Sequence, residues 1–413
     1  MKNLVFLWTT LLCMFFIGCS QSVPAVHSTD FTSVPTTSAP EPSAVPLPQT
    51  QTDYKAIWIS YLELQQYVGL NEQAFRQQVA QITQNCANMG LNTVIVQVRP
   101  FGDALYTSKI FPQSHILAGT QGQPIGYDPL QIFIEESKQR NLQIEAWINP
   151  YRVQLSNSQP AQLSPENPAV LHPEWVVQAN GGLYYNPALP EVQQLVIDGV
   201  KEIVSNYDVN GIHFDDYFYP TTDPSFDADT YAQMSNGMPL ADWRRQNVNT
   251  LIKQVYSTIK EIKPQVRFGI SPQGNNANNY DQQYSDVSLW LKEPGYVDYI
   301  MPQLYWGFDY LTASGRTNYQ FATLCQEWIN YPRHDSVQLY IGLAASRIGE
   351  GDGGANPQTE WSSGNNLAKM VQTLREKGCV GFALYRYNSL YASNYPEIAG
   401  AEIAALTQLL NSQ

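Results

Sequence analysis

The sequence predicts the α/β class and a (β/α)8 TIM barrel, because eight apolar, strand-like runs alternate with eight amphipathic, helix-like runs. Apolar strands in such an alternation form a parallel sheet that helices cover, and eight repeated units allow that sheet to close. A doubly wound open sheet would instead carry a glycine-rich phosphate-binding turn after its first strand, and the sequence has none there. The barrel is therefore the predicted fold.

The eight strands are predicted from short runs rich in β-branched, aliphatic and aromatic residues. In chain order they span residues 55–60, 92–99, 142–149, 210–217, 267–272, 297–306, 337–345 and 380–388. A helix is predicted to follow each strand, because apolar residues recur there at spacings of three and four. The first helix carries that spacing over residues 75–89, and the others span 129–140, 191–207, 241–263, 286–292, 317–331, 366–377 and 397–410. Asp128 precedes the second helix, where its side chain is expected to cap the first turn.

The first 53 residues are predicted to lie outside the barrel. Residues 1–18 have one lysine and then an apolar run, which is the layout of an export signal and is too short for a permanent membrane span. Phe16-Ile17-Gly18-Cys19 resembles a bacterial lipobox, so we expect a lipoprotein signal peptide over 1–18 and lipidation of Cys19, with a plain secreted protein as the alternative. Residues 19–53 are rich in Ser, Thr and Pro and are expected to form a linker to the barrel of residues 54–413. The predicted location is the bacterial cell envelope, at a membrane outside the cytoplasm.

Composition excludes several classes of protein. Lys and Arg total 23 against 36 Asp and Glu, so the formal charge is −13, which is not that of a nucleic-acid-binding protein. The five histidines are scattered, and no HExxH, phosphate-binding or GxSxG motif occurs, so no metal and no cofactor is expected. Cys86, Cys325 and Cys379 are predicted to be small buried residues and not a disulfide framework.

Polar residues gather where the predicted strands end. The carboxyl ends of the strands form the active-site face of a barrel, so these residues are candidates for substrate contact. In chain order they are Arg99, Asn149, Asp215, Asp216, Gln273, Gln303, Tyr305, Trp306 and Arg386. Amide and phenol groups such as those of Gln303 and Tyr305 can hydrogen-bond to sugar hydroxyls, whereas Trp306 could stack on a sugar ring or belong to the core.

The fourth strand, GIHFDDYFYP (residues 211–220), carries the strongest catalytic candidates. Side chains alternate along a strand, so His213, Asp215 and Tyr217 share one face and Asp216 points to the other. If His213 points into the barrel, Asp215 reaches the substrate and is the first-choice catalytic residue. Asp216 could supply a second carboxylate, or the pair could simply cap the junction of strand and loop. His213 could contact substrate or be a satisfied interior histidine.

The third strand, IEAWINPYR (residues 144–152), offers further candidates. Glu145 lies on the same face as Asn149 and four residues before it, so it could be a second carboxylate or the buried partner of Arg99 or His213. Asn149 and Arg152 are better placed to hold the substrate.

Six segments together resemble the bacterial glycosyl-hydrolase-like family ten, a group of barrel lipoproteins. They are KAIWISYLE, GLNTVIVQVRPFGDALYTS, IEAWINPYR, GIHFDDYFYP, GISPQGN and YIMPQLYWGF, and they cover nearly all of residues 55–388. The resemblance implies a (β/α)8 fold, a cell-envelope location and hydrolysis of peptidoglycan glycan strands that lack stem peptides. A more distant similarity to chitinase-like barrels aligns Asp215 with the last Asp of DGxDxDxE, but Tyr217 stands where the catalytic Glu would be.

These observations predict an envelope-tethered glycoside hydrolase that acts on a β-linked amino-sugar polymer. Glycosidases generally use two carboxyl groups, which would be Asp215 with Asp216 or Glu145. Two alternatives stay open. One is a non-catalytic glycan-binding lipoprotein that has lost one carboxylate, and the other is an α-glycosidase that resembles the α-galactosidase-like barrels, in which an Asp nucleophile ends the fourth strand.

Overall fold

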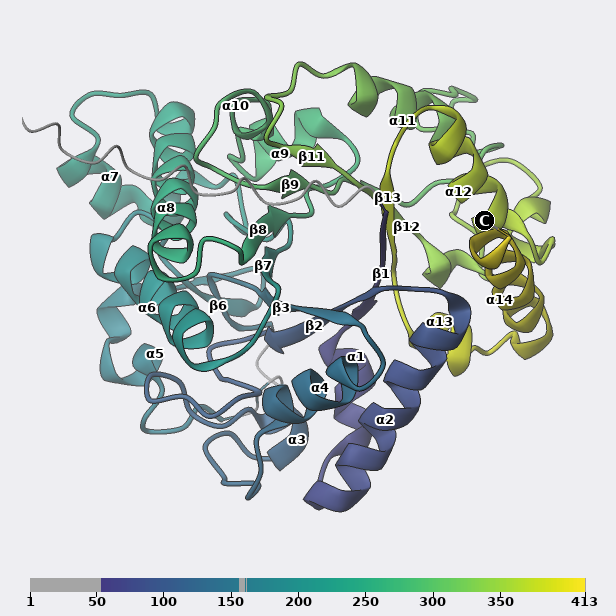
Figure 1. Ribbon diagram of the computed structural model, residues 1–413. Helices are drawn as coiled ribbons and strands as arrows, with labels where there is room; N and C mark the ends of the chain where they lie inside the picture. The colour runs from purple at the N-terminus through teal and green to yellow at the C-terminus, as the bar shows by residue number, and fades with distance from the viewer. Residues whose placement is uncertain (1–52, 156–159, 161, 413) are drawn as a thin grey trace, which may run out of the picture. The chain divides into compact units, whose positions relative to one another are not determined.

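Ten parallel strand segments form the central sheet of the computed structural model, which describes residues 53–155, 160 and 162–412 (Figure 1). In chain order the segments are β1 (Tyr54–Ile59), β2 (Thr93–Arg99), β3 (Gln143–Ile148), β7 (Gly211–Phe214), β8 (Arg267–Ile270), β9 (Tyr299–Ile300), β10 (Gln303–Leu304), β11 (Gln338–Leu339), β12 (Ile341–Leu343) and β13 (Gly381–Leu384). They pair in the order β10-β12-β13-β1-β2-β3-β7-β8-β9-β11.

The sheet closes because its two ends are halves of the same strands. β9 and β10 are separated only by Met301 and Pro302, and β11 and β12 only by Tyr340. β9 pairs with β11 and β10 pairs with β12, and the backbone N–H of Tyr340 continues the ladder by donating to the carbonyl of Ile300 at 3.0 Å. β9 with β10, and β11 with β12, are therefore each one interrupted strand. The ten segments thus make eight strands around the barrel, here called staves, which confirms the predicted (β/α)8 barrel.

The predicted helices surround the strands (Figure 1). They are α2 (Glu72–Met89), α4 (Pro129–Lys138), α6 (Pro190–Asn206), α8 (Leu240–Ile262), α10 (Val287–Lys292), α11 (Phe321–Asn330), α12 (Asn366–Glu376) and α14 (Pro396–Asn411). Asp128 caps α4 as expected, because its side chain accepts the backbone N–H of Gln131. Cys86, Cys325 and Cys379 are buried free thiols, which confirms that they form no disulfide framework.

A small antiparallel sheet after β3 was not predicted. It consists of β4 (Arg152–Gln154), β5 (Val176–Ala179) and β6 (Gly182–Tyr185), in the order β4-β6-β5. β5 and β6 are joined by Asn180 and Gly181, whose φ angles of 51° and 76° are those of a type I′ hairpin turn. An Asn-Gly pair is a strong hairpin signal, so this turn could have been predicted from the sequence. This sheet brings Arg152 to the active-site face of the barrel.

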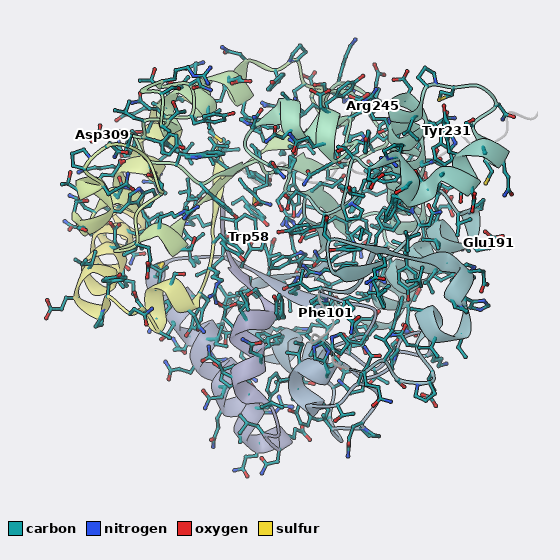
Figure 2. All side chains as sticks on the ribbon, turned by 180° about the vertical axis from the view of Figure 1, so that it is seen from behind. Trp58, Phe101, Glu191, Tyr231, Arg245 and Asp309 are labelled. Carbon is teal, nitrogen blue, oxygen red and sulfur yellow. The ribbon has the colours of Figure 1, made fainter. Side chains whose placement is uncertain are left out.

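Aromatic side chains fill the barrel interior. Trp58, Trp147, Tyr299 and Tyr340 are buried there in a cluster separate from the layer between strands and helices. Figure 2 views the molecule from behind and shows Trp58 near the centre of the barrel. The interior is therefore a packed core, and side chains reach solvent only beyond the strand ends.

The remaining helices are short: α1 (Tyr61–Leu64), α3 (His115–Ala118), α5 (Pro168–Leu171), α7 (Ala228–Met234), α9 (Asn276–Gln282) and α13 (Asn388–Tyr391). Among the helices of the described ranges, none combines the length and apolar character needed to cross a membrane. The predicted signal peptide, Cys19 and all but the last residue of the predicted linker lie outside the described residues.

Candidate active site

Asp215 follows directly after β7 and is held in place by three donors. Its Oδ2 accepts a hydrogen bond from Nδ2 of Asn149 at 2.5 Å and one from the indole N–H of Trp147 at 3.2 Å. Its Oδ1 accepts the backbone N–H of Tyr217 at 3.2 Å. Only 3% of the residue is exposed. The carboxyl group is thus both buried and oriented at the carboxyl end of the barrel.

The pKa of the Asp215 carboxyl is raised to about 7, first by burial and second by the neighbouring charge of Asp216. Arg152, the N–H of Tyr217 and the amide of Asn149 act in the opposite direction. A carboxyl group with a pKa near neutrality keeps its proton for part of the time at physiological pH. This is the property that an acid catalyst needs.

Asp216 turns toward the next strands and accepts hydrogen bonds from amides. Nε2 of Gln303 donates to its Oδ1 at 3.3 Å, and Nε2 of Gln283 donates to its Oδ2 at 3.2 Å. Burial raises the pKa of Asp216, while hydrogen bonds from Gln283, Gln273 and Gln303 lower it. The structure thus brings Gln273 and Gln303 together around Asp216, as their positions after the fifth strand and in the sixth suggested.

The guanidinium group of Arg152 lies near Asp215. Its guanidinium carbon lies 4.9 Å from the centre of the Phe101 ring and 5.4 Å from that of Tyr217, and its Nε donates to the carbonyl of Pro100 at 2.8 Å. Tyr217 is 52% exposed, and the charges of Asp216 and Asp215 raise the pKa of its phenol. A fixed cation and an exposed aromatic ring therefore stand next to the two carboxyl groups.

Tyr305 and Tyr385 also lie near the carboxyl groups. Their rings stack with centroids 5.5 Å apart and an interplanar angle of 24°. Burial raises the pKa of both phenols, and the charge of Asp215 acts on each of them in the same direction. Trp306 instead packs against the rings of Tyr319 and Tyr310 and belongs to the half-buried layer around the outer core, so its predicted stacking role is not supported by these contacts.

Glu145 is not a second carboxylate of this site, contrary to one prediction. Glu145 is fully buried and lies opposite Gly211 of β7, and Gly211 is four residues before Asp215. Glu145 forms an ion pair with Arg267 at 2.7 Å. It also accepts the hydroxyl of Tyr299. Its charge is therefore neutralised deep in the barrel, and its partner is neither Arg99 nor His213.

His213 is an interior histidine and not a substrate contact. It is fully buried, and its ring nitrogens meet the Tyr299 hydroxyl at 2.8 Å, the Ser271 hydroxyl at 3.0 Å and the indole N–H of Trp58 at 3.2 Å. Burial lowers its pKa to about 3, so the ring is neutral at physiological pH. The alternative of a satisfied interior histidine is the one that the structure shows.

Arg99 also departs from its predicted place, because β2 is bulged at its end. Gln97 is opposite Trp147, but Arg99 is opposite Ile148, so the register shifts by one residue. The side chain of Arg99 consequently packs over the ring of Phe111 at 4.5 Å and is 1% exposed. Arg386 stays near the site, but its charge is paired with the buried carboxylate of Glu63.

Gln97, Gln283 and Tyr385 were missed in the sequence. Gln97 is the single polar side chain of the otherwise apolar stretch VIVQV, and its inward position could have been read from strand alternation. Tyr385 directly precedes Arg386 at the end of the eighth strand, and the same positional argument applies to it. Gln283 lies just after α9 and has no comparable local signal.

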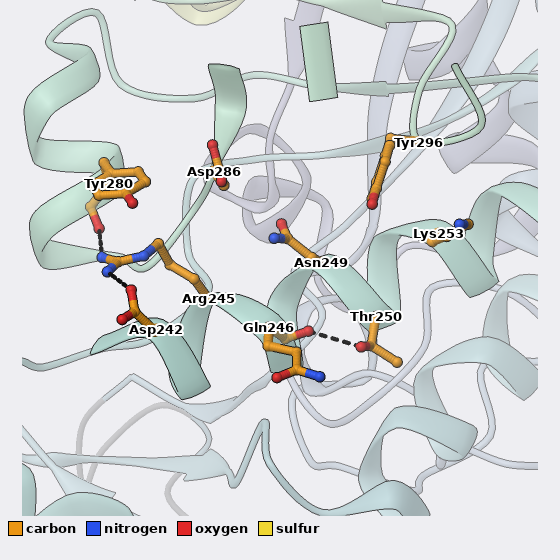
Figure 3. Close-up of a pocket in the computed structure, with 9 residues that line it drawn as sticks. All are labelled: Asp242, Arg245, Gln246, Asn249, Thr250, Lys253, Tyr280, Asp286 and Tyr296. Carbon is orange, nitrogen blue, oxygen red and sulfur yellow. Dashed lines mark hydrogen bonds and ion pairs between the residues drawn. The ribbon is translucent and has the colours of Figure 1, made fainter. Parts of the chain in front are cut away.

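A separate recess of about 350 Å³ lies on the outer flank of the barrel (Figure 3). In Figure 3, Arg245 of α8 lies between Tyr280 and Asp242, and it donates to the Tyr280 carbonyl at 3.1 Å and to Asp242 at 2.6 Å. Acidic and basic side chains both line this recess, and none of its residues is among those that contact Asp215 or Asp216. Within the described residues no group of His, Cys, Asp and Glu side chains could hold a metal ion.

Comparisons with known proteins give consistent results. The sequence model of the family described as Glycosyl hydrolase-like 10 matches residues 53–363. Glycosyl hydrolase YngK of Bacillus subtilis (strain 168) is 36% identical over 370 residues, which cover 82% of this chain and 70% of that protein. Glycosyl hydrolase DigH of Escherichia coli (strain K12) is 37% identical over 288 residues, which cover 63% of this chain and 64% of that protein. The match thus spans less than two thirds of DigH.

Two solved structures share the fold at low identity. The PgaB (BpsB) glycoside hydrolase domain from Bordetella bronchiseptica superposes with a TM-score of 0.57 at 13% identity, covering 86% of this chain and 99% of that chain. The catalytic domain of beta-amylase from Paenibacillus polymyxa gives a TM-score of 0.55 at 12% identity, covering 87% and 98%. At these identities the likeness concerns the fold alone.

Proposed function

Because the chain belongs to the glycosyl hydrolase-like 10 family and is a glycoside hydrolase, we propose that it cleaves a β-linked amino-sugar polymer, namely peptidoglycan glycan strands that lack stem peptides. The observation that carries the catalytic part of this proposal is Asp215, a buried carboxyl group at the end of β7 with a pKa raised to about 7. It lies next to a second carboxyl group, that of Asp216, and glycosidases generally need two.

The two carboxyl groups take different roles in this proposal. In this proposal Asp216, whose anion the amides of Gln283, Gln273 and Gln303 stabilise, is the ionised member of the pair, and its charge helps Asp215 to retain the proton. Asp215 then protonates the oxygen of the leaving sugar. Asp216, stabilised by amide donors, acts as the carboxylate that activates water or attacks the anomeric carbon. A carboxyl separation of roughly 5 to 5.5 Å means retention of configuration, and one of roughly 6.5 to 9.5 Å means inversion.

The environment of Arg152 favours the proposal that the substrate carries carboxylates. Among the described residues its guanidinium has aromatic neighbours and a backbone carbonyl but no carboxylate partner within ion-pair distance. A cation fixed by aromatic rings beside Asp215 can pair with the lactyl carboxylate of a muramic acid residue. Tyr217, Gln273, Gln303 and Tyr305 would orient the sugar through hydrogen bonds and ring contacts, whereas Asn149 is fully buried and would act through Asp215.

The location is part of the proposal as well. The lipobox-like residues 16–19 and the Pro-rich stretch to residue 53 support a barrel that is tethered to a membrane outside the cytoplasm through a lipid on Cys19. Such a location would put the enzyme where peptidoglycan is found.

Incubation of residues 54–413 with peptidoglycan, followed by mass spectrometry of the released fragments, tests the substrate. We expect sugar fragments without stem peptides to be released from amidase-treated peptidoglycan. Few sugar fragments should be released from intact peptidoglycan. Asp215→Asn should fold normally and lose at least about two decades of turnover. Binding without turnover by the unchanged chain would favour a glycan-binding protein, and hydrolysis of aryl α-galactosides would favour an α-glycosidase.

A further inference from the structure

A chain of buried hydrogen bonds leads from the segment after β1 to Asp215. The backbone N–H of Tyr61 donates to Oε1 of Gln97 at 2.9 Å, and Nε2 of Gln97 donates to Oδ1 of Asn149 at 2.6 Å. Nδ2 of Asn149 in turn donates to Oδ2 of Asp215 at 2.5 Å. Gln97 and Asn149 are 1% and 0% exposed, so these contacts do not compete with bulk water.

The direction of this chain is fixed by its first member. A backbone N–H can only donate, so the end of the Gln97 amide that faces Tyr61 has to be the carbonyl oxygen. A side-chain amide has an acceptor at one end and donors at the other, so Gln97 presents its NH2 group to Asn149. Asn149 must then present its oxygen to Gln97 and its own NH2 group to Asp215. The main chain after β1 thus determines which kind of group faces the carboxyl.

The consequence for Asp215 concerns the position of its proton. Oδ2 accepts from Asn149 and also from the indole of Trp147, and both of these groups are donors. A protonated Oδ2 would face two N–H groups, so the exchangeable proton resides on Oδ1. Oδ1 accepts only the N–H of Tyr217 among the described contacts and keeps a lone pair for the proton.

Several charged and titratable groups also act on Asp215. Asp216 lies beside it in the chain, Arg152 approaches from β4, Tyr217 follows in the same segment, and Tyr305 and Tyr385 approach from the ends of two further staves. Asp216 favours the protonated carboxyl, whereas Arg152 and the N–H group of Asn149 favour the ionised one. The orientation of Asn149 therefore contributes to the balance between the two states.

We propose that Gln97 is a positioning residue for hydrolysis, which holds the Asn149 amide with its N–H toward Asp215 and so keeps the transferable proton on Oδ1. This inference rests on the proposed role of Asp215. In the step concerned, the O–H bond at Oδ1 breaks and the proton goes to the glycosidic oxygen of the leaving sugar. Water supplies the hydroxyl group that bonds to the anomeric carbon and the proton that returns to the enzyme.

Replacing Gln97 by an acid of the same shape reverses the direction of the hydrogen bonds between residue 97, Asn149 and Asp215. When the new carboxyl of Gln97→Glu is ionised, both ends of the side chain accept, so the N–H of Tyr61 stays satisfied but Asn149 has to rotate and offer its NH2 group to position 97. Asn149 then presents its oxygen to Asp215, and Asp215 can meet it only by keeping a proton on Oδ2. The pKa of Asp215 should rise by about one unit or more, since a donor to the ionised form is lost.

The test is a pH titration of the full chain in detergent, with carbon-13-labelled aspartate observed by NMR. The Asp215 signal is assigned by its absence in Asp215→Asn, and no substrate is needed. We expect Gln97→Glu to raise the pKa of Asp215, and we expect the rise to fall to less than about half when Asn149→Ala is also present, because the effect passes through Asn149. An unchanged pKa in Gln97→Glu, or an equal rise with and without Asn149, overturns the proposal.

Gln97→Met keeps the test decisive if the acid variant does not fold. Methionine has a similar shape but neither donor nor acceptor, so Asn149 loses its orientation, and kcat on stem-peptide-free glycan strands should fall about tenfold or more with a smaller change in KM. The matched control is Gln193→Met, a buried amide on α6 that donates to the Pro187 carbonyl and contacts no part of the site. Both variants should lose thermal stability, and only Gln97→Met should lose kcat. Equal kcat in the two variants contradicts the proposal, whereas full activity of Asp215→Asn contradicts the proposed function instead.

Discussion

Asp215 is a carboxyl group whose acidity is set by burial and by Asp216 more than by its own hydrogen-bond donors. The same influences that let it hold a proton also make its ionised form costly in the folded protein. The folded chain therefore binds this proton more tightly than the unfolded chain does. Stability contributed by the group is fully present below its ordinary pKa of 3.8 and is lost as the pH rises through about 7.

A comparison of Asp215→Asn with the unchanged chain checks this sign. Asparagine does not titrate, so the melting temperature of the variant relative to the unchanged chain should increase as the pH rises from about 4 to about 8. Differential scanning calorimetry at several pH values measures the difference. A difference that stays constant over this range would show that Asp215 is ionised throughout.

The pH dependence of hydrolysis should follow the same group. If Asp215 is the acid, kcat/KM has to fall as the pH rises through about 7, because the proton is then absent from the free enzyme. His213 cannot produce this limb, since burial lowers its pKa to about 3. Measurement of initial rates between about pH 5 and 9 decides the matter. Activity that rises across pH 7 would assign the opposite role to Asp215.

Arg152 should determine how strongly the enzyme prefers a substrate that carries carboxylates. Arg152→Gln should lower kcat/KM on stem-peptide-free glycan strands by about 10- to 100-fold, which corresponds to a charge-assisted hydrogen bond of about 1.5 to 3 kcal/mol. Any hydrolysis of neutral chitin oligosaccharides should change much less. Arg245→Gln is the matched control, because Arg245 also stacks on a tyrosine, at 3.9 Å, but lies in the outer recess. An equal loss on both substrates would show that Arg152 does not act by pairing with a carboxylate of the substrate.

At the scale of elements, β8 depends on a glycine. A Cβ atom at Gly269 would lie 1.9 Å from Cζ of Tyr299, a fully buried residue that donates to Glu145 and contacts His213. Gly269→Ala should therefore displace Tyr299 and destabilise the fold by about 1 to 3 kcal/mol, as overpacked cores generally do. Gly400→Ala in α14 is the control, because nothing lies within 4 Å of its added methyl group. Chemical denaturation should show a loss for the first variant and no loss for the second.

The strands and helices of the barrel could be predicted, because their apolar periodicity reflects burial directly. Predicted and observed bounds differ by a few residues, as for α11, which begins at Phe321 and not at residue 317. The bulge that turns Arg99 outward could not be predicted, since it depends on pairing between β2 and β3. The chain of amides to Asp215 could not be predicted either, because it joins residues 61, 97, 149 and 215 from four separate segments.

At the scale of the whole molecule, alternation along the chain predicted that the sheet closes, and a proline marks the break in the sixth stave, whereas nothing in the sequence signals the break at Tyr340 in the seventh. Pro302 has no backbone N–H and interrupts the sixth stave between β9 and β10. The neighbouring stave is interrupted at the same level, and the backbone N–H of Gly342 still reaches the Pro302 carbonyl at 2.9 Å. Gln303 follows this break, which is why a residue of the sixth stave can reach Asp216.

The envelope location is testable on the full chain. Cys19→Ala removes the proposed lipid acceptor, so the protein should move from the membrane fraction to the soluble fraction when cells are fractionated. Activity per molecule should stay the same, because the barrel is untouched. Retention of the variant in the membrane fraction would contradict the anchor.

The direction of β1 also separates the start of the barrel from its catalytic face. β1 starts at Tyr54, whereas Asp215 lies beyond the far end of β7, and the two strands are parallel members of one barrel. A six-residue strand is about 20 Å long, so Tyr54 lies on the face of the barrel opposite the one that carries the carboxyl groups. Additions at this end of β1 would therefore leave the catalytic face open to a glycan.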